Sequence, residues 1–137
     1  MKNLEEQLVS FETAKLAKDK GFDEYCFKGY RNDTKRIMSL SQIDFDSIYE
    51  NTSEEDIFEE LFFKNSKVVE DYSITAPTQS LLQKWLREKY DTIVCPVPNN
   101  SKWSIYSEKF LYGNASNFDT YEEALEEGLL QALKLIK

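Results

Sequence analysis

Apolar residues recur at helical spacing in three stretches, which predicts three main helices near residues 11–20, 77–90 and 120–136. Ser10 stands where a side-chain oxygen can cap the first helix. Gly21 stands at its other end, where a left-handed residue is needed to stop a helix. The first helix is therefore bounded at both ends by residues suited to those positions.

The second and third helices have clear apolar faces. Pro77 suits the first helical turn, because its missing N–H would have no intrahelical partner there. The second helix then buries one face, made of Leu81, Leu82, Trp85 and Leu86. At the third helix, Thr120 with Glu123, or Asp119 with Glu122, forms a capping box. The predicted solvated side of this helix carries Glu122, Glu123, Glu126 and Glu127. We expect Trp85 to lie in the core.

Shorter apolar and aromatic runs predict strands at residues 25–30, 36–41, 67–74, 93–97 and 102–112. The polar residues 99–101 separate the last two as a turn, which predicts a hairpin with a loop of three to five residues. We expect an α+β fold, with the three main helices packed on one small antiparallel or mixed sheet that includes this hairpin. The length of 137 residues suits one domain, residues 1–137.

The middle of the chain is strongly acidic. Ser53 is placed to cap a short helix over residues 54–63, and residues 44–60 contain no basic residue. This run does not match the calcium-binding loop of an EF-hand. If the loop began at Asp44, Tyr49 would occupy the position where the sharp turn needs glycine. A solvated acidic helix face is the simpler interpretation.

The net charge of −8 makes nucleic acid an unlikely partner. Basic residues gather in the first quarter of the chain, but acidic residues are interleaved with them. An acidic surface that imitates nucleic acid is an open alternative, and solubility is the simplest reason for the charge. The N-terminus has no apolar signal region and no run is long enough to span a bilayer, which predicts a soluble cytoplasmic protein with no membrane contact.

Several kinds of chemistry are excluded by residue types. The chain has no histidine, which removes histidine-based hydrolysis and almost every catalytic zinc arrangement. It also has no glycine-rich phosphate-binding motif. Cys26 and Cys95 lie far apart in apolar surroundings, which favours two buried, reduced thiols over a disulfide. We expect no catalytic residue, no cofactor and no tightly bound transition metal. Carboxylate acid–base chemistry stays open, but no pair is singled out by spacing.

The strand predicted at residues 102–112 carries apolar side chains in both phases. One phase holds Trp103, Ile105 and Leu111, and the other holds Tyr106, Phe110 and Tyr112. Helices could cover both faces, a bulge near Ser107 could shift the phase, or one face could contact a partner. The last alternative makes Tyr106, Phe110 and Tyr112 a candidate interaction surface.

Three stretches carry a resemblance: ITAPTQSLLQKWLREK at residues 74–89, LVSFETAKLA at residues 8–17 and YEEALEEGL at residues 121–129. They resemble a group of small proteins found in phages and prophages of gut bacteria. This resemblance implies a mobile-element context and no catalytic residue. We therefore expect a non-enzymatic accessory or protein-interaction factor that binds a protein partner or associates with itself. The alternative is a small enzyme or small-ligand binder that uses carboxylates, tyrosine or cysteine.

Overall fold

The computed structural model describes residues 7–26, 28–39, 65, 73–109 and 117–136. The elements in chain order are α1 (Phe11–Asp19), β1 (Lys28–Arg31), β2 (Ile37–Ser39), β3 (Ser73–Thr75), α4 (Gln79–Tyr90), β4 (Cys95–Asn99), β5 (Lys102–Tyr106) and α5 (Tyr121–Leu135). The predicted helix at residues 54–63, the acidic run at residues 44–60 and Leu111 lie outside the described residues.

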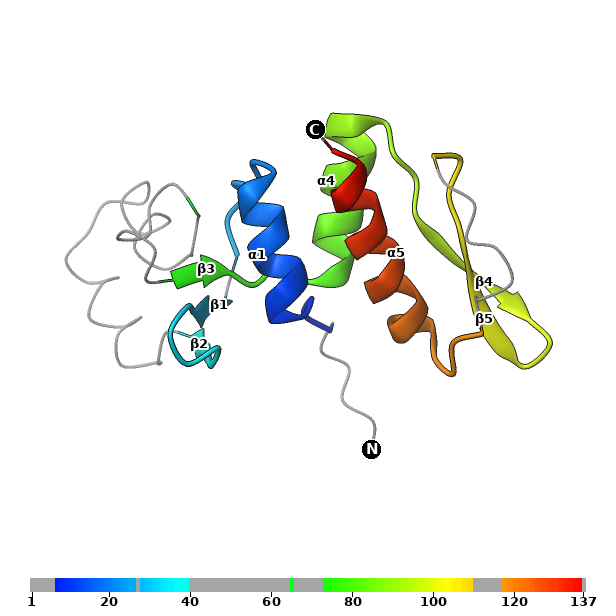
Figure 1. The fold of residues 1–137 in the computed structure, drawn as a ribbon, viewed down its shortest axis with the longest axis horizontal. Coiled ribbons are helices and arrows are strands. Elements are labelled where there is room, and N and C mark those ends of the chain that lie inside the picture. The colour runs from blue at the N-terminus through cyan, green and yellow to red at the C-terminus, as the bar shows by residue number, and fades with distance from the viewer. Residues whose placement is uncertain (1–6, 27, 40–64, 66–72, 110–116, 137) are drawn as a thin grey trace, which may run out of the picture.

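The described elements form an α+β fold, as the sequence predicts. The helices α1, α4 and α5 make a central layer, with a sheet on either side of it (Figure 1). One sheet has the order β2-β1-β3 and the other is the β4–β5 hairpin. The sequence predicted that the hairpin would join a single sheet. This prediction is wrong, because the hairpin forms a second sheet, which packs against α5. None of the helices in the described ranges is long and apolar enough to cross a membrane.

Both ends of α1 are fixed by local hydrogen bonds. The Ser10 hydroxyl accepts the backbone N–H of Thr13. At the other end Gly21 has a φ of +96°, a conformation that glycine adopts without a steric penalty. The N–H of Phe22 then donates to the Ala17 carbonyl at 2.9 Å, and the N–H of Gly21 donates to Lys18 at 3.1 Å. These two bonds make a Schellman ending, the predicted stop.

The helix α4 begins two residues later than predicted. Thr78 is its N-cap, and its hydroxyl accepts the N–H of Leu81. Pro77 instead lies in an extended segment, where its carbonyl accepts the N–H of Val9 at 3.0 Å. This bond to the N-terminal segment holds Pro77 outside the helix. Because Val9 and Pro77 are far apart in the sequence, the local pattern could not predict it.

The three-stranded sheet has β1 in its centre, antiparallel to both neighbours. Tyr30 in β1 is buried, and its hydroxyl donates to the Val9 carbonyl at 2.6 Å, which ties the sheet to the chain before α1. The strand β1 starts three residues later than the predicted run 25–30 and ends one residue beyond it, and of the predicted run 67–74 the structure describes only residues 73 and 74, both in β3. Pairing partners, and not apolar character alone, set the ends of a strand.

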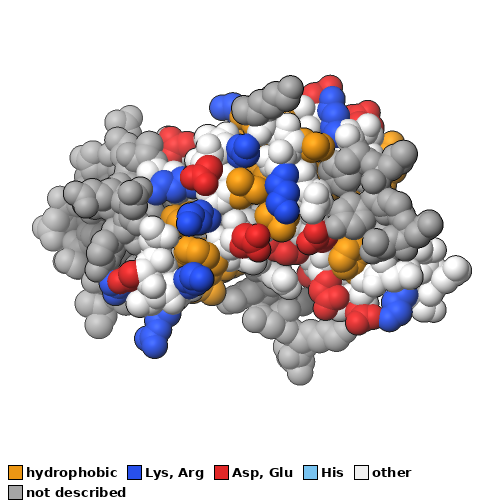
Figure 2. Space-filling view, viewed as in Figure 1, with side chains coloured by type: hydrophobic (Ala, Val, Ile, Leu, Met, Phe, Trp, Pro, Cys, Tyr) orange, Lys and Arg blue, Asp and Glu red, His pale blue; other side chains and the backbone are white. Residues whose placement is uncertain are grey.

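The helix α5 begins at the predicted cap, because the Thr120 hydroxyl accepts the N–H of Glu123. Its buried side packs against α1, α4 and both strands of the hairpin and consists of Ala124, Leu125, Gly128, Leu129, Ala132 and Leu133. Figure 2 shows acidic side chains over α5 and its junction with α1. Most of the predicted solvated side is thus at the surface.

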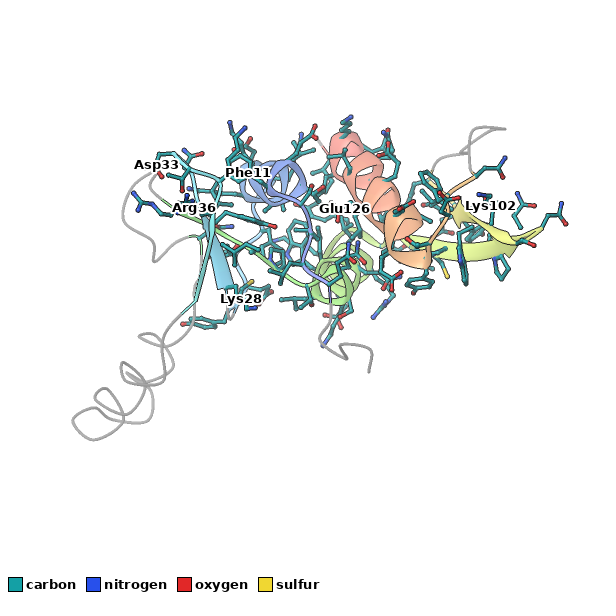
Figure 3. The ribbon with its side chains drawn as sticks, turned by 90° about the horizontal axis from the view of Figure 1, so that it is seen from below. Phe11, Lys28, Asp33, Arg36, Lys102 and Glu126 are labelled. Carbon is teal, nitrogen blue, oxygen red and sulfur yellow. The ribbon has the colours of Figure 1, made fainter. Side chains whose placement is uncertain are left out.

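Glu126 departs from that prediction, because it joins three helices (Figure 3). Its carboxylate accepts the N–H of Ser10 at 3.1 Å and the hydroxyl of Thr13 at 2.5 Å, both at the start of α1. It also accepts the amide of Gln79, at the start of α4, at 3.2 Å. A carboxylate beside the first turn of α1 also complements the helix dipole. Glu126 is therefore a structural residue at the α1–α4–α5 junction.

The β4–β5 hairpin turns in two residues and not in the three to five expected. Asn99 pairs with Lys102, and the two residues between them, Asn100 and Ser101, have φ values of 50° and 71°. Positive φ at both positions is the mark of a type I′ turn, whose twist matches that of the strands. The strand β5 also ends at Tyr106, shorter than the predicted run to residue 112, because a turn follows at residues 108–109.

Candidate interaction surface

The register of the β4–β5 hairpin sorts its side chains onto two faces. Directly paired residues of an antiparallel ladder point to the same side, and neighbours along a strand point to opposite sides. The pairs on one side are Pro96 with Ile105 and Pro98 with Trp103, and those on the other side are Cys95 with Tyr106 and Val97 with Ser104.

The first of these faces packs on α5. Ile105 is buried, and its side chain lies beside Gly128, where an added Cβ would come within 2.9 Å of it. The Trp103 ring meets the Tyr121 ring edge-on, with centroids 5.3 Å apart. Close approach at a glycine and an aromatic contact thus fix how the hairpin sits on the helix.

The opposite face points away from α5, and we call it the outer hairpin face. Its apolar members are Ile93, which precedes the strand, Cys95, Val97 and Tyr106. Tyr106 is 55% exposed, Ile93 41% and Val97 36%. Regularly paired strands hold these side chains in place, so they form an apolar strip on a rigid element and not on a loop.

Tyr106 is the one member of the predicted surface that the structure describes. Phe110 and Tyr112 lie outside the described residues. In the other phase, Trp103 is half-buried and Ile105 is buried, as an inner face requires. The turn at residues 108–109 ends the strict alternation on which the grouping of Tyr106, Phe110 and Tyr112 depended.

The sequence reasoning missed the β4 half of the outer hairpin face. Ile93, Cys95 and Val97 alternate with Val94, Pro96 and Pro98. Both prolines belong to one phase, which should have marked the other phase as a separate face.

The edge of β4 that faces away from β5 offers few hydrogen-bond donors. The backbone of Trp103 exchanges two bonds of 2.8 Å with Phe118, on the side of β5 away from β4. The Pro98–Trp103 pair is therefore not a hydrogen-bonded pair, and the nitrogens of Pro98 and Pro96 face the outer edge of β4. Because proline has no N–H, this edge disfavours the addition of another strand.

The two cysteines differ in exposure, which corrects the expectation that both are buried. Cys95 lies exposed on the outer hairpin face, whereas Cys26 is buried. Burial, with a smaller contribution from the nearby Glu24 charge, raises the pKa of the Cys26 thiol to about 12. Cys26 therefore stays protonated at neutral pH and is poorly reactive.

This difference predicts selective labelling. At mildly alkaline pH, an aromatic disulfide reagent should modify one thiol of the folded chain quickly, and the second only after denaturation. The Cys95→Ser variant should lose the fast reaction and keep the slow one. Fast labelling that persists in Cys95→Ser would show that Cys26 is accessible in the folded protein.

A separate groove lies beside α4. It has a volume of about 310 Å³ and is lined by Glu24, Leu81, Lys84, Trp85, Glu88 and Lys89. Two carboxylates and two ammonium groups surround two apolar side chains, which is the composition of an ordinary helix surface. Nothing in this lining selects a catalytic pair or a ligand.

Within the described residues, no group of three or more cysteine, aspartate or glutamate side chains is arranged to hold a metal ion. Comparison of the chain with known protein families, with curated proteins and with solved structures finds no significant match.

Proposed function

We propose that this protein is a non-enzymatic protein-interaction factor that uses the outer hairpin face to bind a protein partner. The observation that carries the proposal is the apolar strip of Ile93, Cys95, Val97 and Tyr106, all four of which are more than a third exposed. The inner side of the same hairpin already packs on α5 and contributes to the core. The outer strip is therefore not needed to bury the hairpin.

A different protein fits this face better than a second copy of the chain. Two copies would each carry a charge of −8 and would repel one another. Edge-to-edge pairing of two β4 strands is disfavoured by Pro96 and Pro98. A partner with an apolar surface and a neutral or basic rim would avoid the repulsion and extend the contact.

The setting of this interaction is part of the proposal. The resemblance of three stretches to small phage and prophage proteins supports an accessory role in a phage or mobile element. The same proposal places the protein in the cytoplasm, where the free thiols of Cys26 and Cys95 would stay reduced. The partner is then a protein of the phage or of its host cell.

The test compares two variants of equally exposed residues. Tagged protein is used to capture partners from lysogenic host cells, and the candidate partner is purified and titrated directly. We expect Tyr106→Ser to weaken binding about thirtyfold, equivalent to about 2 kcal/mol for a central interface aromatic. Leu135→Ser is the matched control, since Leu135 is 52% exposed at the end of α5 and Tyr106 is 55% exposed on the hairpin.

Circular dichroism should show that both variants fold. Equal binding by wild type and Tyr106→Ser, or equal weakening by the two variants, would refute the assignment of the outer hairpin face. A concentration-dependent dimer that Tyr106→Ser abolishes would instead make a second copy the occupant and would overturn the proposed hetero-partner.

A further inference from the structure

The charge of this chain is not evenly spread. Residues 10–36 contain seven Lys or Arg and five Asp or Glu, whereas the remaining residues contain ten and twenty. The local balance is thus +2, within a chain whose remaining residues carry −10. This segment comprises α1, β1 and the turn that leads to β2, so its charges lie on α1 and on the β1–β2 hairpin.

An aromatic contact brings part of this charge together. The Phe11 ring meets the Tyr30 ring edge-on at 5.7 Å, which joins the start of α1 to β1. The Lys35 ammonium lies over the Phe11 ring, 5.5 Å from its centroid. Lys15 follows Phe11 by four residues and therefore lies on the same side of α1. Arg36 is opposite Arg31, whose N–H donates to the Arg36 carbonyl at 2.9 Å, so the Arg36 side chain points to the other face of the hairpin from Ile37.

An exposed apolar residue borders these cations. Ile37 pairs with Tyr30 across the β1–β2 ladder, so the two side chains share a face of the sheet. Tyr30 is buried against Phe11, but Ile37 is 54% exposed. We call the surface formed by Lys15, Lys35 and Ile37 around Phe11 the basic face. In Figure 2, Lys and Arg side chains surround hydrophobic ones over α1 and the β1–β2 hairpin.

Some nearby cations are already paired, and others are not. Arg31 forms a bridge of 2.9 Å with Asp33, and Lys20 donates to the Ile136 carbonyl at 2.6 Å. Lys15 and Arg36 are exposed and form no ion pair with another described residue. Lys35 is held over Phe11 from a turn position with a φ of 60°, which is uncommon for a residue other than glycine.

We propose that the basic face binds a short acidic segment of a partner protein, with an apolar residue of that segment reaching Ile37. Charge complementarity supports this occupant, since Lys15 and Lys35 present two exposed ammonium groups beside the Phe11 ring and the exposed Ile37. Glu12 and Asp19 are exposed on α1 and limit the surface to a few residues of peptide. This binding is independent of the outer hairpin face, which lies on the far side of the helical layer (Figure 1).

A nucleic acid fits the basic face less well. The Lys35 ammonium covers a face of the Phe11 ring, so that face is not open for a base to stack on. A strand of any length would also run on to the acidic side chains over α5 (Figure 2). At physiological ionic strength charges are screened beyond about 8 Å, so a short segment confined to the basic face avoids that repulsion.

The test measures fluorescence anisotropy with three probes. They are a short peptide of Glu and Asp around a central leucine, the same peptide with Gln and Asn in place of the acids, and a single-stranded oligonucleotide of similar length. We expect the acidic peptide to bind, its affinity to fall as salt rises, and the amide peptide to bind at least about tenfold more weakly, because charge pairing drives the contact.

Two charge-matched variants locate the site. The double variant K15E/K35E should weaken peptide binding at least tenfold more than K84E/K89E, which reverses two exposed cations on α4. Both variants change the net charge equally, so a general field effect would weaken binding equally and would overturn the proposal. Oligonucleotide binding as tight as that of the acidic peptide, or no peptide binding at low salt, would also overturn it. Neither result bears on the outer hairpin face.

Discussion

Replacing Trp85 with alanine is expected to destabilise the protein by ~3–5 kcal/mol, the usual range for truncating a large buried aromatic side chain. Trp85 is only 6% exposed. Its ring meets Phe22 edge-on at 5.3 Å and Tyr90 at 5.1 Å, so it joins α4 to the chain that follows α1. Since domains are stable by about 5–15 kcal/mol, this loss is a large share of the total.

Urea unfolding followed by circular dichroism measures the effect of Trp85→Ala. The variant Trp85→Phe should lose less free energy of unfolding than Trp85→Ala, because it keeps an aromatic ring between Phe22 and Tyr90. Arg87→Ala, at an exposed position of the same helix, should change stability by no more than about 0.5 kcal/mol. A loss below about 1 kcal/mol for Trp85→Ala would contradict the burial of this ring.

Replacing Gly128 with valine is expected to cost about 3 kcal/mol, at the upper end of the range for overpacking a core. A Cβ on Gly128 would lie 2.6 Å from Cγ1 of Val94 and 2.9 Å from Cγ2 of Ile105. Both neighbours are buried and β-branched, so they have few alternative rotamers. The gain of about 1 kcal/mol in helix propensity on replacing a glycine cannot offset such contacts.

A double-mutant cycle separates this clash from other effects of the substitution. Val94→Ala removes the nearer of the two methyl groups and makes room for a Cβ at position 128. The variant that combines Gly128→Ala with Val94→Ala should therefore be more stable than the two single losses predict, with a coupling of about 0.5 kcal/mol or more. Strictly additive losses in thermal or urea unfolding would mean that the hairpin does not rest on Gly128.

Local interactions explain which parts of the fold could be predicted from the sequence. The Ser10 cap, the Gly21 ending and the Thr120 cap depend on hydrogen bonds within a few residues, and all three are present. The apolar spacing of the three helices likewise depends on helix geometry alone. The α+β class and the burial of Trp85 follow from that spacing, and the structure confirms both.

The candidate surface could be predicted only in part. Tyr106 was identified because the aromatic strand has apolar side chains in both phases. Ile93, Cys95 and Val97 were missed, because their exposure depends on which face of the hairpin meets α5. The sequence shows that basic residues are concentrated in the first quarter of the chain. It does not show that α1 and the β1–β2 hairpin meet, which depends on the contact between Phe11 and Tyr30.

The sequence by itself determined the three helices, both ends of α1 and the start of α5, the acidic charge and the lack of histidine chemistry, because each depends on composition or on neighbours within one turn. Only the tertiary structure decided that the hairpin forms a second sheet, that Pro77 stays outside α4, and that Glu126 faces Ser10, Thr13 and Gln79 instead of solvent. These features depend on contacts between residues far apart in the chain. The packing of the elements against one another decides whether a side chain contacts solvent, the core or a polar partner. A local sequence pattern does not specify this packing.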